Sequence, residues 1–188
     1  MRLEDANKLF NEIAGIRFGK LFMPSQLQDI IINKGRTGQL LEMALGLQLS
    51  STNLDFDDGE LKTNKCDSVG NPLETVFVTQ ISSIIDELLG ETPFEHTRLF
   101  QKISNILYVP VCKEGTPETW MFLRSIHVNT LERPFSSLLP VWKNDYNSIC
   151  KQLHNHIDVN FQFFIPKKRP PCIAPAAFHE LAWLFLSS

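Results

Sequence analysis

The segment "DFDDGELKT" at 55–63 combines residue types that could hold a metal ion. Its charged side chains are four carboxylates and one amine: Asp55, Asp57, Asp58, Glu60 and Lys62. Side chains alternate between the two faces of a strand, so Glu60 and Lys62 should emerge on the same side, with Leu61 pointing into the core. If Asp55 lies on the opposing arm of a tight bend, its carboxylate can converge with that of Glu60 on one divalent cation, and oxygen ligands suit magnesium.

Lys62 would then lie next to a metal-bound water. Its ammonium could orient or help to deprotonate that water and offset the charge that builds up on an attacked phosphodiester. This spacing also occurs often by chance, and acidic clusters usually just face water. The segment alone therefore leaves two interpretations open, a solvated acidic loop and a site that cleaves phosphodiesters.

The surrounding elements would have to position these side chains. Residues 33–47 place Leu40, Leu41, Ala44 and Leu45 at helical spacing between Gly38 and Gly46, with Glu42 beside the apolar face. Residues 59–64 and 73–81 are predicted strands joined by the turn residues "DSVGNP", which together indicate a hairpin. We expect the helix that carries Glu42 to pack against this hairpin.

Elements at both ends complete an α/β pattern. Helices are predicted at 4–15, with Leu9, Phe10 and Ile13 on one face, and at 23–32, with Ser25 as N-cap. Residues 103–111 begin as a helix and continue as a buried strand that Pro110 should end. Residues 119–128 alternate as a further strand, and 140–157 form an amphipathic helix with Trp142, Tyr146, Ile149 and Leu153 on one side.

Composition limits the class of protein. A chain of 188 residues with 43% hydrophobic residues is long enough for one well-filled core and short for two, so a single domain over 1–188 is predicted. The net charge of −3 means that any surface for nucleic acid must be a local basic patch. The four cysteines form no CxxC pair, which favours free thiols and a cytoplasmic location. No segment is long and apolar enough to predict a membrane span.

Four blocks of the sequence, taken in order, resemble those of MutH-type mismatch-repair endonucleases and, more distantly, of the restriction endonucleases that cut GATC. The blocks are "KGRTGQLLEMALG" (34–46), "DFDDGELKT" (55–63), "DSVGNPLETVFV" (67–78) and "FEHTRLFQKISNILYVPV" (94–111). The resemblance covers about residues 34 to 111. It implies a restriction-endonuclease-like fold of the PD-(D/E)xK type, in which a mixed sheet is flanked by helices.

The resemblance also implies roles for individual residues. Glu42 matches the family's helical acidic residue, Asp55 and Glu60 match its two metal-binding carboxylates, and Lys62 matches its catalytic lysine. Lys102 falls where the family carries a further active-site lysine. The family uses Mg²⁺ and recognises GATC in double-stranded DNA. It nicks the unmethylated strand of hemimethylated DNA when the partner protein MutL activates it.

Two departures from the family pattern affect these expectations. Only five positions separate Asp55 from Glu60, a contraction by two residues that could let Asp57 or Asp58 replace Asp55 as a ligand. The C-terminal third is abbreviated, and "FQFFIPKKRPPC" (161–172) resembles the family's "RPK" recognition segment with Ile165 in place of the arginine. The second departure concerns GATC specificity more than cleavage.

Five basic residues are candidate DNA contacts: Lys34, Arg36, Lys167, Lys168 and Arg169. The first two precede the Glu42 helix and would contact phosphates if the duplex passes there. The other three lie between prolines, where they form either a solvated turn or a stiff phosphate-binding loop. His154 and His156 are two positions apart on a predicted helix and face different ways, which favours surface roles over metal binding.

The sequence thus predicts an α/β, Mg²⁺-dependent DNA endonuclease of methyl-directed mismatch repair, with a MutL-like activator as a possible partner. Two alternatives stay open. One is a type II restriction endonuclease of the GATC-cutting group, and the other is a non-cleaving module that binds DNA or MutL. Nothing duplicates the catalytic segment, so we expect a monomer.

Overall fold

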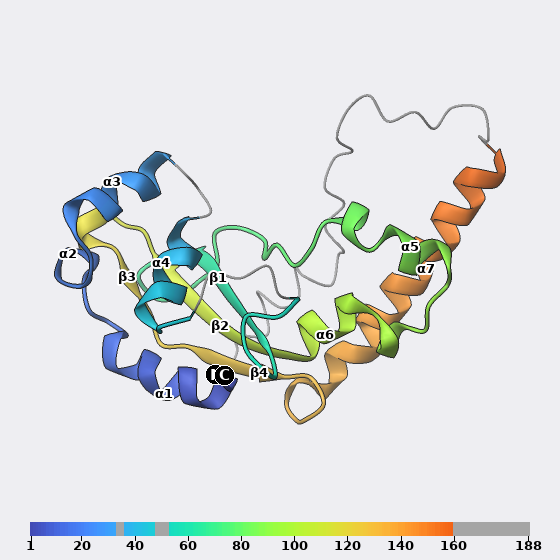
Figure 1. Ribbon diagram of the computed structural model, residues 1–188, viewed down its shortest axis with the longest axis horizontal. Coiled ribbons are helices and arrows are strands. Elements are labelled where there is room, and N and C mark those ends of the chain that lie inside the picture. Colours follow the sequence, from blue (N-terminus) through green and yellow to red (C-terminus); the bar gives the residue numbers. More distant parts are fainter. Residues whose placement is uncertain (33–35, 48–52, 160–188) are drawn as a thin grey trace.

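The computed structural model describes residues 1–32, 36–47 and 53–159, and only the backbone of 157–159. Within these ranges the chain forms a four-stranded mixed sheet flanked by helices (Figure 1). The strands are β1 (Glu60–Cys66), β2 (Asn105–Cys112), β3 (Met121–Phe122) and β4 (Ile126–Asn129). The helices are α1 (Leu3–Ile13), α2 (Phe18–Leu21), α3 (Pro24–Ile32), α4 (Arg36–Ala44), α5 (Ile85–Leu89), α6 (Arg98–Ser104) and α7 (Leu138–Val159). The predicted α/β class is confirmed.

Strand β2 lies at the centre of the sheet. It runs parallel to β1, with Glu60 opposite Ile106 and Lys62 opposite Tyr108. On its other edge it pairs antiparallel with β4 and then with β3. A parallel pair needs a crossover connection, and residues 67–104 supply one that contains α5 and α6.

The predicted hairpin is wrong, because the described structure assigns no strand to residues 73–81. The chain does turn back after β1: Pro72 bridges Cys66, and the amide of Leu73 donates to the carbonyl of Lys65 at 2.8 Å. It then leaves the strand, and Val78 is buried against the face of the sheet that α5 and α7 cover. Burial of this apolar side chain takes the place of further ladder hydrogen bonds.

Two further strand predictions need correction on the other edge of the sheet. Pro110 does not end β2, which continues to Cys112. The single strand predicted at 119–128 is two short strands, β3 and β4, and the break between them lies opposite Pro110. A proline has no N–H to donate, so an interrupted partner strand suits it. Its carbonyl still accepts from the amide of Leu123 at 2.9 Å.

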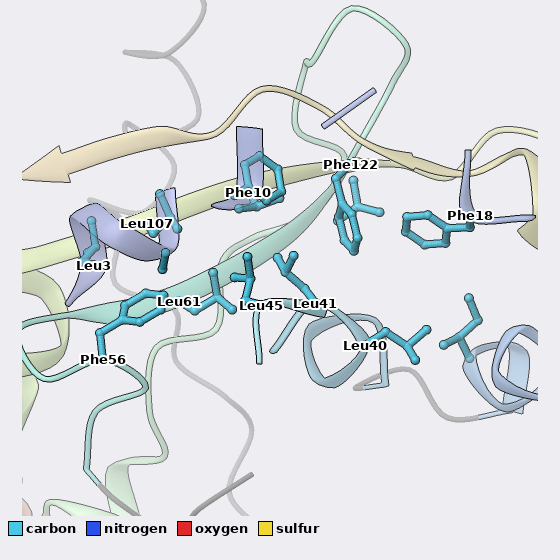
Figure 2. Close-up of a cluster of buried hydrophobic side chains, with 14 of the residues drawn as sticks. Leu3, Phe10, Phe18, Leu40, Leu41, Leu45, Phe56, Leu61, Leu107 and Phe122 are labelled. Atoms are coloured by element: carbon cyan, nitrogen blue, oxygen red, sulfur yellow. The ribbon is translucent and has the colours of Figure 1, made fainter. Parts of the chain in front are cut away.

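Helices α1 to α4 cover one face of the sheet (Figure 2). Leu61 of β1 and Leu107 of β2 pack there against Leu41 and Phe10. Leu9 was predicted on this face but is 42% exposed, because the buried stripe of α1 runs through Leu3, Ala6 and Phe10 instead. Helix α3 begins at Pro24, so Ser25 lies inside the helix and is not its N-cap.

Helices α5 to α7 cover the opposite face. The alternation of β2 sends Ile106 and Tyr108 to this side, where they join a second buried cluster. Helix α7 confirms the predicted amphipathic helix, since Trp142 and Tyr146 are buried and Ile149 and Leu153 pack against the same cluster. The three described cysteines, Cys66, Cys112 and Cys150, are free and buried. Among the described residues, no helix is long and apolar enough to cross a membrane.

Candidate active site

The carboxylate of Asp55 accepts a hydrogen bond from the first interior amide of β1. Residues 55–59 form a tight acidic turn, in which the amide of Phe56 donates to the carbonyl of Gly59 at 2.9 Å. The buried ring of Phe56 anchors this turn in the core, and Asp55 Oδ2 accepts from the amide of Leu61 at 2.9 Å. The exposed carboxylate of Asp55 therefore lies beside the start of the strand that carries Glu60 and Lys62.

Glu60 is the most buried charged residue of this region, with 2% of its surface exposed. Its Oε1 accepts from Lys62 Nζ at 2.7 Å and from Lys102 Nζ at 2.9 Å. The contact between Glu60 and Lys62 confirms the predicted side-chain alternation, and Leu61 lies in the core on the other face. The second oxygen, Oε2, is buried and has no hydrogen-bond partner among the described residues.

Helix α6 brings Lys102 to this point from 42 positions further along the chain. Thr97 caps the helix, because its hydroxyl accepts from the amide of Phe100 at 3.0 Å. Buried Ile103, the next residue after Lys102, anchors the helix in the core. These two anchors turn the neighbouring Lys102 toward Glu60.

Helix α4 contributes Glu42. Buried Leu40 and Leu41 attach this helix to the sheet, and the helix ends before Gly46, which has a φ of +71°. Gly38 lies inside the helix and does not bound it, contrary to the prediction. Burial raises the pKa of the Glu42 carboxyl above its ordinary value, and the charges of Asp55 and Glu60 raise it further, whereas Lys62 lowers it. Glu42 thus shares one electrostatic environment with the other acidic residues and Lys62.

The two alternative carboxylates of the contracted loop are placed differently. Asp58 turns toward the start of α1, where its Oδ1 accepts from the amide of Leu3 at 2.7 Å and its Oδ2 from Arg2 Nε at 3.1 Å. Asp57 is exposed. Neither is among the charges that shift the pKa of Glu42, and Asp55 is. The charges that act on Glu42 therefore group Asp55 with Glu60 and Lys62.

The residues present fit a hard divalent cation. Among the described residues, Glu60 Oε2 is a buried oxygen without a partner that could serve as an anionic ligand, and Asp55 adds an exposed carboxylate. Within the described ranges, no group of three His, Cys, Asp or Glu side chains could hold a metal by itself. Magnesium suits such a sparse ligand set, since it usually keeps several waters and takes only one or two protein carboxylates.

Most of the predicted DNA contacts lie outside the described residues: Lys34, Lys167, Lys168 and Arg169. Arg36 is described, and its guanidinium pairs with Asp29 of α3 at 3.4 Å on the surface. Sequence analysis did not single out Asn105, whose side chain contacts the acidic turn. Its only sequence signal is its position at the start of a predicted buried strand.

Comparison with known proteins gives relatives that are DNA mismatch repair proteins. No family model matches the chain. The DNA mismatch repair protein MutH of Shewanella woodyi is 32% identical over 150 residues, which are 75% of this chain and 62% of the relative. The protein of the same name from one strain of Haemophilus influenzae is 33% identical over 154 residues, which are 78% of this chain and 66% of the relative.

The alignments take in about three quarters of this chain, and the chain covers slightly less than two thirds of the length of either relative. The similarity agrees with the order of the sequence blocks and with the gathering of Glu42, Asp55, Glu60 and Lys62 at the start of β1. The chain is therefore similar to the DNA mismatch repair protein MutH over about three quarters of its own length, which supports a MutH-type mismatch-repair endonuclease.

Proposed function

We propose that this chain is a DNA endonuclease of mismatch repair that hydrolyses one phosphodiester with the help of Mg²⁺. The observation that carries the proposal is Glu60, a buried carboxylate with one oxygen bound by two lysines and the other unpartnered. Its position beside Asp55 and Glu42 suits a site that binds a cation next to an attacked phosphate. The sheet flanked by helices is compatible with a restriction-endonuclease-like fold.

The residues of the chain divide the work between them. Asp55 and Glu60 would hold the cation, which when bound supplies a lowered water pKa and charge stabilisation at the phosphate. The Lys62 ammonium, 2.7 Å from Glu60 Oε1, orients a water for in-line attack and offsets negative charge on the phosphate oxygens. A P–O bond to the water oxygen forms as the P–O bond to the leaving sugar oxygen breaks, the water gives up a proton to solvent, and the leaving oxygen takes one up.

Lys102 has a second role in this scheme. With its Nζ 2.9 Å from Glu60 Oε1, it shares the negative charge of that oxygen and leaves Oε2 as the ligand atom. Glu42 adds a third carboxylate at the margin of the site, and burial is the main cause of its raised pKa.

We further infer that the substrate is double-stranded DNA with GATC-like sites, cut on the unmethylated strand, and that a MutL-like protein activates the cut. The names of the relatives, which are mismatch repair proteins, support a repair role over restriction. A monomer with one site should nick, because it positions one water at one phosphodiester. A restriction enzyme would need a second copy for the other strand.

A time course on supercoiled plasmid tests the proposal. With Mg²⁺, open circles should appear first and linear DNA only later, and the Lys62→Ala protein should leave the plasmid supercoiled. When plasmids that differ only in GATC methylation are compared, the methylated strand should not be cut. Linear product without an open-circle intermediate, at a rate second order in enzyme, would favour a dimeric restriction enzyme. Binding without any cleavage would favour the non-cleaving module.

A further inference from the structure

The acidic turn at 55–59 packs directly on Asn105, the first residue of β2. The side-chain amide of Asn105 donates from Nδ2 to the carbonyl of Asp58 at 2.6 Å. The next residue of the turn, Gly59, lies so close that a Cβ there would be 2.6 Å from the carbonyl oxygen of Asn105. One residue of β2 therefore contacts the turn through both its side chain and its backbone.

His127 of β4 fixes the orientation of the Asn105 amide. Its Nε2 lies 2.7 Å from Asn105 Oδ1. Since Nδ2 already donates to Asp58, the remaining amide atom, Oδ1, can only accept, so Nε2 of His127 carries the hydrogen. The contacts form a chain from His127 through Asn105 to the carbonyl of Asp58.

This chain of contacts matters because Asp55 and Glu60 lie on opposite sides of the turn. Glu60 is fixed by its pairing with Ile106, the residue after Asn105. Asp55, at the other end of the turn, is fixed to β1 because its carboxylate accepts from the amide of Leu61. The separation of the two carboxylates therefore depends on the path of the chain between them, at Asp58 and Gly59.

We propose that Asn105 is a positioning residue of the active site, which holds the acidic turn so that the Asp55 carboxylate faces Glu60. The inference rests on the proposed function in one respect, namely that these two carboxylates bind a divalent cation. Its structural part, the dependence of the Asp55–Leu61 hydrogen bond on Asn105, does not require any activity.

The test compares Asn105→Leu with a matched control, Thr130→Val. Leucine resembles asparagine in shape but neither donates nor accepts. The Thr130 hydroxyl donates to the carbonyl of Ser104 at 3.0 Å, so its loss removes a side-chain hydrogen bond beside Asn105 without touching the turn. Asn105→Asp is a second variant that keeps the size and the acceptor for His127 but no longer donates to Asp58.

Two readouts are measured on each protein. The first is hydrogen exchange of the Leu61 amide, followed by NMR on the metal-free protein. The second is the affinity for Mn²⁺, followed by the EPR signal of the free ion. In both Asn105 variants the Leu61 amide should exchange faster, and Mn²⁺ binding should weaken by about 10-fold or more, as for other residues that orient metal ligands. Thr130→Val should leave both readouts as in the unmodified protein.

Unchanged exchange and unchanged affinity in both Asn105 variants would overturn the proposal. Equal losses in Thr130→Val would also overturn it, because they would reflect general loosening of the sheet. If the unmodified protein neither binds Mn²⁺ nor nicks DNA, the proposed function fails, and the exchange of Leu61 still decides the role of Asn105. His127→Gln, whose amide can donate to Asn105, should retain more Mn²⁺ affinity than His127→Ala.

Discussion

At the scale of single residues, Glu60 gives the most direct test of the proposed site. Asp55→Ala and Glu60→Ala should each lower the nicking rate by about 100-fold or more, because each removes a proposed metal ligand. Asp57→Ala should have a mild effect, since Asp57 is exposed and lies outside the gathered set. Initial rates on supercoiled plasmid at saturating Mg²⁺ measure the effect. Near-normal nicking by Glu60→Ala would reject the site.

Glu60→Ala should also lower the stability of the fold, an effect that the sequence alone does not indicate. Glu60 is buried, and Lys62 and Lys102 both depend on its carboxylate for a counter-charge. Its removal leaves two partly buried ammonium groups close together without the carboxylate that pairs with both. We therefore expect a lower unfolding temperature for Glu60→Ala than for Asp55→Ala, whose carboxylate is exposed. Equal unfolding temperatures in a calorimetric comparison would contradict this account.

Glu42 allows a prediction about pH. Its folded-state pKa is raised, so the folded protein holds a proton that the unfolded chain releases at lower pH. The resulting stability is present below the ordinary glutamate pKa and is lost as pH rises through the raised value. Glu42→Gln should therefore raise the unfolding temperature of the metal-free protein at pH 7, and this gain should vanish at low pH. A gain of the same size at both pH values would argue against ionisation as its source.

At the scale of elements, two glycines with different surroundings test how tightly the site is packed. A Cβ on Gly59 would meet the Asn105 carbonyl at 2.6 Å and Leu3 Cδ1 at 2.7 Å. Gly59→Ala should therefore lower the free energy of unfolding by about 1–3 kcal/mol, the usual cost of overpacking. Denaturant titration with matched m-values measures this loss. If the Gly59→Ala protein were as stable as the unmodified protein, the turn would be able to shift away from Asn105.

Gly38→Ala is the contrasting substitution. Gly38 lies within α4, and a Cβ there would come no closer than 3.6 Å to Thr63 Oγ1, an ordinary contact. Alanine is the better helix former, so this change should raise the free energy of unfolding by about 0.5–1 kcal/mol. The same titration applies. A loss of stability would mean that α4 and β1 are closer than a methyl group allows.

At the scale of the whole molecule, charge limits how the chain can bind DNA. The net charge of −3 gives no general attraction for a polyanion, so affinity must come from local basic segments such as 167–169. Lys168→Ala and Arg169→Ala should each weaken binding to any duplex and reduce the salt dependence by about one phosphate contact. Lys167→Ala should weaken binding to GATC duplexes more than to scrambled ones. Equal losses on both would reduce Lys167 to a backbone contact.

Local sequence determined the parts of this protein that depend on near neighbours in the chain. Strand alternation places Glu60 and Lys62 on one face and Leu61 on the other, and the apolar stripe of α7 selects Trp142 and Tyr146 for burial. Both follow from fixed backbone periods, which any window of the sequence reveals. The resemblance to known endonucleases added Glu42 and Lys102, which no local pattern could connect to Glu60.

Tertiary structure decided which segments meet. β1 pairs with β2, more than 40 positions away, and not with the adjacent segment 73–81, whose Val78 is buried in the cluster that α5 and α7 cover. That parallel pairing brings Lys102 to Glu60 and Asn105 to the acidic turn. Such contacts depend on the competition between burial and backbone pairing over the whole chain, and a local sequence pattern records only one side of that competition.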